Sequence, residues 1–228
     1  MTVPNIIVAV DGYSSTGKSS FAKLLARDLD LLYLDSGALY RGVTLFAQEN
    51  GYITEANVIS DGLKEALDGL DLRFGPAGKL YIGDRCIEAE IRGMKVSSQV
   101  SPIATVPYVR EFVDEKLHWL ARDGRVVMDG RDIGTTVFPN AQIKLFMTAS
   151  EDVRAKRRYD EMISKGLNPS LDEVKANLRE RDYIDSHRET SPLRRPVDSY
   201  ELDNSDMTLK EEVEWAKGLI RGIYKLYD

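Results

Sequence analysis

The sequence contains only one cysteine, Cys86, among its 228 residues. A single cysteine excludes an internal disulfide and a cysteine-built zinc site, which is typical of a protein from a reducing cytosol. We interpret Cys86 as a small, buried apolar residue. The sequence also lacks an apolar run of the about 20 residues that a membrane helix needs, and no basic segment opens it. We therefore expect a cytoplasmic protein without a membrane partner.

Positive charge is in deficit, with 31 Lys and Arg against 37 Asp and Glu and a net charge of −6. This balance argues against a dedicated nucleic-acid-binding protein and leaves room only for local basic clusters. Internal repeats and low-complexity tracts are absent as well. The length is sufficient for one α/β domain that carries an insertion.

The segment GYSSTGKS, residues 12–19, matches the phosphate-binding P-loop pattern G-x-x-x-x-G-K-[ST]. An apolar, β-branched run at residues 6–10 precedes it, and apolar residues at helical spacing follow it at 21–29. Strand, loop and helix form the context that the motif requires, because backbone N–H groups and the helix N-terminus then face one phosphate. A Ser/Gly-rich turn with an incidental lysine is the alternative. The predicted donor-binding residues are Gly12, Tyr13, Ser14, Ser15, Thr16, Gly17, Lys18, Ser19 and Ser20.

Five short predicted strands, beginning near residues 6, 31, 126, 143 and 200, alternate with predicted helices and indicate a five-stranded parallel sheet. Helix starts are marked by Pro107, by Ser150 and by capping boxes at Ser170 and Thr208. We also expect a helix over residues 55–70. Alternating residues around the GPAG turn at 75–78 predict a hairpin, and residues 86–91 a further short strand. These antiparallel segments predict an inserted subdomain at about 51–105.

Acidic residues follow three of the predicted strands, at Asp11, Asp35 and Asp129. The ligand site of an open α/β sheet lies at the carboxyl ends of its strands, so we expect the site at this edge. Asp129 occupies the position where a P-loop protein places the acid that holds Mg²⁺, directly or through water, and the Ser19 hydroxyl would be a second ligand. A structural aspartate that caps a loop is the alternative for Asp129.

Arginines concentrate in the last third of the sequence. Arg181, Asp185 and Arg188 are spaced to share one helix face, which a solvated salt-bridge ladder would also explain. Five arginines fall within 17 positions: Arg179, Arg181, Arg188, Arg194 and Arg195. Bound phosphates would relieve their repulsion, and phosphoryl transfer depends on the positioning and charge stabilisation that arginine supplies. We therefore predict a donor on the P-loop and an anionic acceptor that Arg41, Arg131 and Arg188 could hold.

Three further segments resemble the bacterial cytidylate (CMP/dCMP) kinases: LDSGALYR at 34–41, MDGRDIGTTVFP at 128–139, and RERD at 179–182 with Asp185 and Arg188 beyond it. The resemblance extends over essentially the whole sequence. It implies an α/β, three-layer P-loop NTPase fold with helices on both faces of the sheet. The core would comprise residues 1–50 and 106–228, the nucleotide-binding insert about 51–105, and a short lid about 152–168. The implied activity is Mg²⁺-dependent transfer of the ATP γ-phosphoryl group to CMP or dCMP. We expect the protein to be a monomer.

The resemblance also implies roles for individual residues. Those expected to bind CMP are Ser101, Arg110 and Asp132 at the base, Arg181 and Asp185 at the sugar, and Ser36, Arg41, Arg131 and Arg188 at the acceptor phosphate. The expected catalytic residues are Lys18, Arg131, Arg154, Arg158 and Arg188, and Arg157 is a further lid arginine. The P-loop departs from the family, which usually has Pro and Gly where this sequence has Tyr13 and Ser15. Ser15 would fit without strain if its φ were negative.

Two other functions fit part of this pattern. One is a kinase for UMP, AMP or a small anionic metabolite, which the relative turnover of the monophosphates would distinguish. The other is a nucleotide-gated switch, but such GTPases normally carry an N-K-x-D guanine motif, and the sequence has none. An aspartate acting as general base is not required, because the acceptor phosphate is already largely deprotonated near neutral pH.

Overall fold

The computed structural model describes residues 3–226. This part of the chain divides into two compact units. The first unit comprises the described residues up to Leu34 and from Asp123 onward, and the second comprises Asp35–Arg122. The predicted insert, about 51–105, falls inside the second unit.

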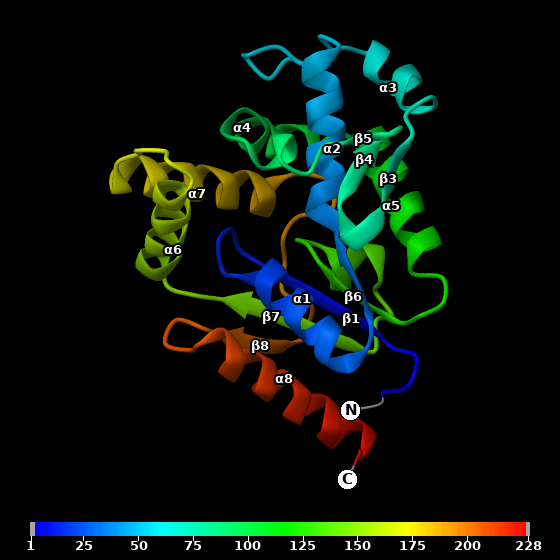
Figure 1. Cartoon of the computed structure of the whole chain (residues 1–228), viewed down its shortest axis with the longest axis vertical. Helices are drawn as coiled ribbons and strands as arrows, with labels where there is room; N and C mark the ends of the chain where they lie inside the picture. The colour runs from blue at the N-terminus through cyan, green and yellow to red at the C-terminus, as the bar shows by residue number, and fades with distance from the viewer. Residues whose placement is uncertain (1–2, 227–228) are drawn as a thin grey trace. The chain divides into compact units, whose positions relative to one another are not determined.

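A five-stranded sheet forms the centre of the first unit (Figure 1). Its strands are β1 (Ile7–Gly12), β2 (Leu32–Asp35), β6 (Val126–Asp129), β7 (Ile143–Thr148) and β8 (Tyr200–Asp203). The order across the sheet is β2-β6-β1-β7-β8, and β1 pairs in parallel with both β6 and β7, as β7 does with β8. The predicted α/β fold with a five-stranded parallel sheet is therefore confirmed, and β1 delivers the P-loop at the middle of the sheet.

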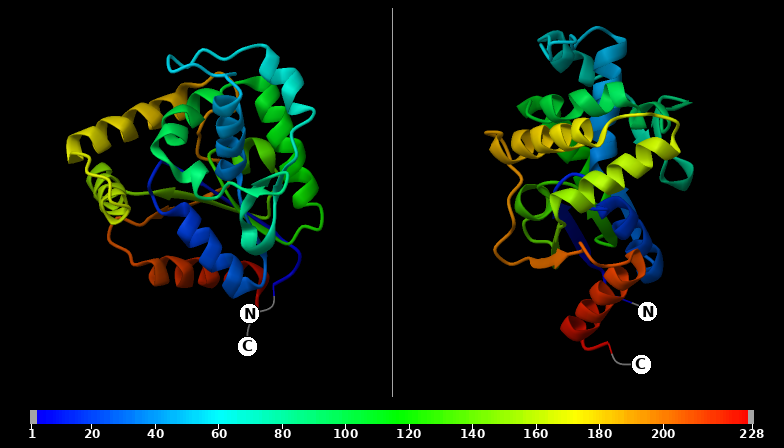
Figure 2. Two further views of the ribbon diagram at one scale, coloured as in Figure 1. Left: turned by 45° about the horizontal axis from the view of Figure 1, so that its top comes forward. Right: turned by 90° about the vertical axis from the view of Figure 1, so that its left-hand side faces the viewer.

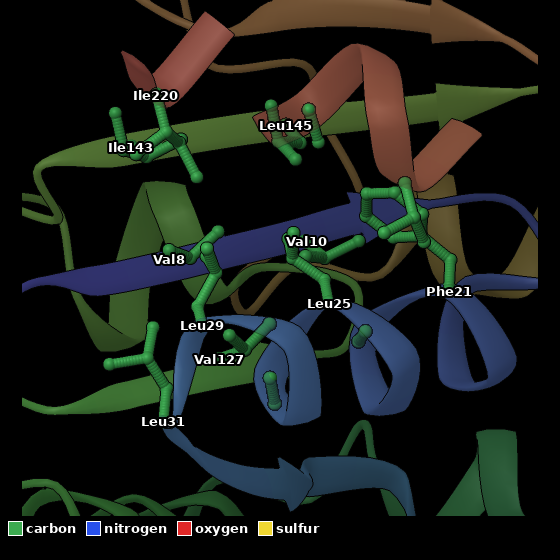
Figure 3. Close-up of a cluster of buried hydrophobic side chains, with 14 of the residues drawn as sticks. Val8, Val10, Phe21, Leu25, Leu29, Leu31, Val127, Ile143, Leu145 and Ile220 are labelled. Atoms are coloured by element: carbon green, nitrogen blue, oxygen red, sulfur yellow. The ribbon is translucent and has the colours of Figure 1, made fainter. Parts of the chain in front are cut away.

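Helices α1 (Lys18–Leu29) and α8 (Leu209–Tyr224) pack their apolar stripes on this sheet. Figure 3 shows Leu25 and Leu29 of α1 pointing toward Val8 and Val10 of β1, with Ile220 of α8 in the same cluster. Removing a leucine of this kind from water contributes about 1.5–3 kcal/mol. This burial stabilises the packing of β1 and α1, the two elements that the P-loop connects.

Helices α6 (Glu151–Ser164) and α7 (Leu171–His187) pack against each other through a small cluster of their own (Figures 1 and 2). The cluster consists of Ala155, Met162, Val174 and Leu178. The predicted helix starts are confirmed, because the Ser150 side chain caps α6 and Ser170 forms a capping box with α7, as Thr208 does with α8. The predicted lid, residues 152–168, thus consists of most of α6 and the turn after it.

The second unit combines helices with a small antiparallel sheet. Its elements are α2 (Ser36–Glu49), α3 (Gly62–Leu67), β3 (Leu72–Phe74), η1 (Pro76–Gly78), β4 (Leu80–Ile82), β5 (Arg85–Cys86), η2 (Glu90–Arg92), α4 (Met94–Ile103) and α5 (Pro107–Leu120). Strands β3, β4 and β5 pair antiparallel in that order, so the hairpin around residues 75–78 is confirmed, as is the helix start at Pro107.

In the second unit, three predictions were wrong, for one helix, one strand and the burial of Cys86, and one helix was not predicted. The expected helix over 55–70 is limited to Gly62–Leu67, because Asn57 adopts a left-handed φ of 61° and Ile53 pairs with Ile59 in a β-bridge. The expected strand over 86–91 ends at Cys86, which is exposed on the two-residue strand β5 instead of buried. Helix α4 was not predicted, since its apolar residues are interrupted by polar ones and by a proline in its last turn.

Among residues 3–226, the helices are all too short or too polar to cross a membrane.

Candidate functional site

The P-loop joins the end of β1 to the start of α1 and has an unusual backbone. Gly12 has a φ of 147°, and a Cβ at this position would lie 2.1 Å from the carbonyl oxygen of Met147, so only glycine fits. Gly17, at 91°, is left-handed and is the N-cap of α1. Ser15 is also left-handed, with a φ of 60°, in contrast to the negative φ required for a strain-free fit. A left-handed non-glycine residue costs about 1–2 kcal/mol, which the surrounding contacts of the loop must offset.

Lys18, predicted to hold the donor phosphates, is buried with 5% of its surface exposed. Its ammonium group donates hydrogen bonds to the carbonyl of Tyr13 at 2.5 Å and to the hydroxyl of Thr16 at 3.3 Å. Burial lowers the pKa of Lys18 well below its ordinary value, and the neighbouring Arg131 lowers it further. An incoming anion would favour the charged ammonium form.

Ser19 and Asp129, the two predicted Mg²⁺ ligands, are directly hydrogen-bonded. The Ser19 hydroxyl donates to Asp129 Oδ2 at 2.7 Å, and the hydroxyl of Tyr33 donates to Oδ1 at 2.9 Å. The described residues contain no group of three or more histidines, cysteines, aspartates or glutamates that could hold a metal by themselves. Two oxygen donors are what a Mg²⁺ site needs when nucleotide phosphates and water complete its coordination. The donor set therefore fits the ion.

Two ion pairs, one partly and one fully buried, link the loop after β6 to the end of α7. Arg131 Nε donates to Asp185 at 2.8 Å, and Arg188 Nη2 donates to Asp132 at 3.0 Å. The side chains of the second pair are 3% and 5% exposed. Burial opposes ionisation of Asp185, but the surrounding arginines, Arg131 first, outweigh it and lower its pKa. Both acids hold guanidiniums in place at the carboxyl edge of the sheet.

Arg131 also reaches the P-loop, since its Nη2 donates to the Ser14 hydroxyl at 3.1 Å. This contact joins an arginine predicted to bind the acceptor phosphate to the loop predicted to bind the donor. Burial would lower the pKa of Arg131, but Asp185 and further acids outweigh it and raise that pKa. The group is therefore a permanent cation.

Asp11 at the end of β1 was not given a role in the sequence-based analysis. Its carboxylate is 1% exposed and accepts hydrogen bonds from the backbone N–H groups of Ile133, at 2.8 Å, and Gly134, at 2.7 Å. These residues open the π-helical turn η3 (Ile133–Val137), which follows Asp132. Asp11 thus anchors the segment that carries two of the predicted binding residues. Its position at a strand end was the available signal.

The three arginines of the predicted lid, all on α6, have different partners. Arg154 donates to the Ser14 carbonyl at 3.1 Å and to Asp182 of α7 at 2.5 Å. Arg157 donates to the Thr16 carbonyl at 3.2 Å, whereas Arg158 pairs with Glu161 on its own helix at 2.9 Å. Two of the three predicted lid arginines therefore contact the P-loop.

Asn204, directly after β8, is a P-loop support that the sequence analysis missed. Its side chain is fully buried and donates to the Thr16 carbonyl at 2.7 Å and to Glu212 of α8 at 2.9 Å, while its own oxygen accepts from Arg157 at 3.0 Å. The rule that polar residues at strand ends face the site could have identified it.

The second unit carries the remaining predicted residues. Ser36 is buried at the start of α2, and Arg41 of the same helix pairs with Asp35 at 2.8 Å. Arg92, which the sequence analysis did not select, donates to the same carboxylate at 3.1 Å. Burial opposes ionisation of Asp35, but Arg41 and Arg92 outweigh it and lower its pKa. Two guanidiniums therefore converge on one acid at the start of α2.

Ser101 and Arg110, predicted to contact the base, lie on α4 and α5 of the second unit and are both buried. Arg110 donates to the Ala104 carbonyl at 3.3 Å, and its guanidinium lies 5.5 Å from the centre of the Tyr40 ring. A cation over an aromatic face is attracted by it, which fixes the orientation of this arginine.

The predicted residues are divided between the two units. The first unit contains the P-loop residues, Asp129, Arg131, Asp132, Arg154, Arg157, Arg158, Arg181, Asp185 and Arg188. The second unit contains Ser36, Arg41, Ser101 and Arg110. Within the first unit, the structure joins Ser14, Arg131 and Asp185 through consecutive hydrogen bonds.

A P-loop in the middle of a five-stranded parallel sheet, with an acid bonded to its serine, places the chain in the class of P-loop nucleotide-binding proteins. A sequence model of the cytidylate kinase family matches residues 8–221, and the chain belongs to that family. It is 45% identical over 215 residues to the cytidylate kinase of Bacteroides thetaiotaomicron, covering 92% of this chain and 94% of that one.

One further relative agrees with the family, and one solved structure agrees with the fold. The cytidylate kinase of Parabacteroides distasonis is 46% identical over 215 residues, which again cover 92% of this chain and 94% of the relative. The crystal structure of an uncharacterised protein from Eubacterium ventriosum matches 96% of this chain and 99% of that chain, with a TM-score of 0.50 and 12% identity. The structural match supports the fold alone.

Proposed function

We propose that this chain transfers the γ-phosphoryl group of ATP to CMP or dCMP, giving ADP and the corresponding diphosphate. Membership of the cytidylate kinase family supports the reaction class and the acceptor. The observation that carries the proposal is the chain of hydrogen bonds from Ser14 of the P-loop through Arg131 to Asp185. It connects the P-loop to an arginine that suits an anionic acceptor and to an acid that suits sugar hydroxyls. A protein that only binds a donor nucleotide would not need this second set of groups.

The donor phosphates would bind to the backbone N–H groups of residues 12–20 and to the Lys18 ammonium. Lys18 would exchange its present partner, the Tyr13 carbonyl, for phosphate oxygens. Ser19 and Asp129 would hold Mg²⁺, with Asp129 acting directly or through water. When bound, the ion neutralises charge on the donor phosphates. Tyr33 would keep Asp129 oriented through its hydrogen bond of 2.9 Å.

The acceptor phosphate would bind to Ser36, Arg41, Arg131 and Arg188. Because Arg131 and Arg188 are already paired with buried acids, their guanidiniums are held in position before substrate arrives. An acceptor oxygen can then attack the γ-phosphorus without a protein nucleophile, since phosphoryl transfer depends mainly on alignment and charge stabilisation. Arg154 and Arg158 of the lid would stabilise the charge on the moving group.

The base would be recognised by Ser101, Arg110 and Asp132, and the sugar by Arg181 and Asp185. Cytosine presents an amino donor beside acceptor atoms, so a carboxylate and a guanidinium can bind the same edge. Uracil would place an acceptor against the Asp132 carboxylate, which costs about 1–3 kcal/mol for an unpaired buried group. We further propose that the protein acts in the cytoplasm as a monomer, with small molecules as its partners.

Steady-state kinetics with CMP, dCMP, UMP and AMP test the proposal. We expect ADP formation to depend on the acceptor and kcat/KM to be highest with CMP or dCMP. A preference for UMP or AMP would contradict the base assignment. ATP hydrolysis that no monophosphate accelerates would refute the transferase function and favour a nucleotide switch.

A further inference from the structure

Asp182 belongs to the RERD segment on α7 and is not among the residues expected to bind the donor, the acceptor or Mg²⁺. Its Oδ1 accepts a hydrogen bond from the Ser14 backbone N–H at 3.0 Å, and its Oδ2 accepts one from Arg154 Nη1 at 2.5 Å. The Asp182 side chain is 14% exposed and that of Arg154 is 10% exposed. One carboxylate therefore bridges the phosphate-binding loop and a lid arginine.

Both partners of Asp182 are groups of the kind that bind phosphate oxygens. Backbone N–H groups of a P-loop form an anion-binding nest, and arginine can bind phosphate through two parallel hydrogen bonds. Arg154 also donates to the Ser14 carbonyl at 3.1 Å, and its guanidinium lies 5.4 Å from the centre of the Tyr13 ring. The Asp182 carboxylate thus uses contacts that the phosphates of a donor nucleotide would otherwise use.

We propose that Asp182 is a positioning residue that competes with the donor nucleotide for Arg154 and for the Ser14 N–H. In the nucleotide-free protein, its carboxylate neutralises Arg154 and keeps the guanidinium on the loop. A bound donor phosphate takes over Arg154, and the bond to Asp182 breaks. The price of holding the arginine ready is a weaker affinity for the donor. The inference rests on the proposed function, because it takes ATP as the donor.

Two substitutions separate the two hydrogen bonds. In Asp182→Asn, the amide oxygen can still accept from Ser14 N–H, but the amide nitrogen is a donor that cannot bind Arg154. Asp182→Ala loses both bonds. Asp160→Asn is the matched control, because Asp160 lies on α6, pairs with Lys156 at 3.0 Å and is exposed. It removes the same charge from the helix that carries Arg154, where the carboxylate pairs with Lys156 and not with Arg154 or the loop.

Calorimetric titration with a non-hydrolysable ATP analogue and Mg²⁺, without acceptor, tests the competition. We expect Asp182→Asn to bind the analogue about tenfold more tightly than the wild type, and Asp160→Asn to stay within about twofold. Asp182→Ala should bind at least as tightly as Asp182→Asn. A purely structural role would loosen the loop and weaken binding, so weaker or unchanged affinity in Asp182→Asn would overturn the proposal.

Hydrogen exchange at the Ser14 amide gives a second measurement that does not depend on affinity. Without nucleotide, the amide should exchange faster in Asp182→Ala than in the wild type, and the bound analogue should remove this difference. Equal exchange rates in the two free proteins would contradict the proposal. Protection of the β1 amides reports in the same experiment that the variants are folded.

Phosphorylation of CMP by the wild type, measured on the same preparations, tests the proposed function separately from the competition by Asp182. If the wild type does not phosphorylate CMP, the proposed function fails. If it does, and Asp182→Asn binds the analogue no more tightly, only the competition by Asp182 is refuted.

Discussion

Asp11 allows a quantitative test of how burial sets the pH dependence of stability in this protein. Its carboxyl group is 1% exposed and lies against the N–H groups of Ile133 and Gly134. Burial raises the pKa of Asp11 from the ordinary value of 3.8 to about 7, because loss of hydration penalises the ionised form more than the two hydrogen bonds favour it. The nearby charge of Asp132 raises the pKa of Asp11 further, and that of Lys18 lowers it.

The sign of the effect follows from the protons bound in each state. Unfolded chains lose the Asp11 proton near pH 4 and folded molecules near pH 7, so the folded state binds more protons between these values and its stability falls as pH rises. At about 1.4 kcal/mol for each pKa unit, the interval from 3.8 to about 7 corresponds to about 4 kcal/mol. Of this, about 2 kcal/mol is lost between pH 5.5 and pH 8.

Urea unfolding of the wild type and of Asp11→Asn over this pH range measures the effect. Asparagine does not titrate, and the other titratable groups are the same in both proteins. The difference between their free energies of unfolding at each pH therefore reports the titration of Asp11 alone. We expect the advantage of the wild type to shrink by about 2 kcal/mol from pH 5.5 to pH 8. Asp28→Asn is the control, since bonding to Arg27 lowers the pKa of that partly exposed carboxyl. The effect of this substitution on the free energy of unfolding should therefore be constant in this pH range. An equally constant difference for Asp11→Asn would refute the reasoning.

Three further perturbations separate structural roles from substrate recognition. Asn204→Ala leaves the buried Thr16 carbonyl and Glu212 without the amide donor, so urea unfolding should show a loss of about 2 kcal/mol, and an unchanged midpoint would contradict this. Ser170→Ala removes the cap of α7 and should cost about 1 kcal/mol in the same assay. Asp132→Asn should lower the kcat/KM preference for CMP over UMP by about tenfold. An unchanged ratio would argue against base recognition by Asp132.

Local signals predicted most of the first unit. Strands β1, β6 and β7 are mostly apolar runs because the middle of the sheet is buried. The helix starts at Ser150, Ser170 and Thr208 depend on bonds over three residues. The second unit was predicted less well. Its short elements do not show a full helical period, and Asn57 interrupts the segment 55–70 through a backbone conformation that its sequence does not require.

The amino-acid sequence by itself determined the P-loop, the order of strands and helices along the chain and the strand ends that carry acids. Only the tertiary structure decided which partners those groups have. Arg131 pairs with Asp185 across 54 positions, Asp11 binds Gly134 across 123, and Asp182 binds Ser14 across 168. The physical reason is that a charged side chain pairs with whatever group the packed sheet and helices bring within hydrogen-bond distance, and separation along the chain carries no signal for this choice.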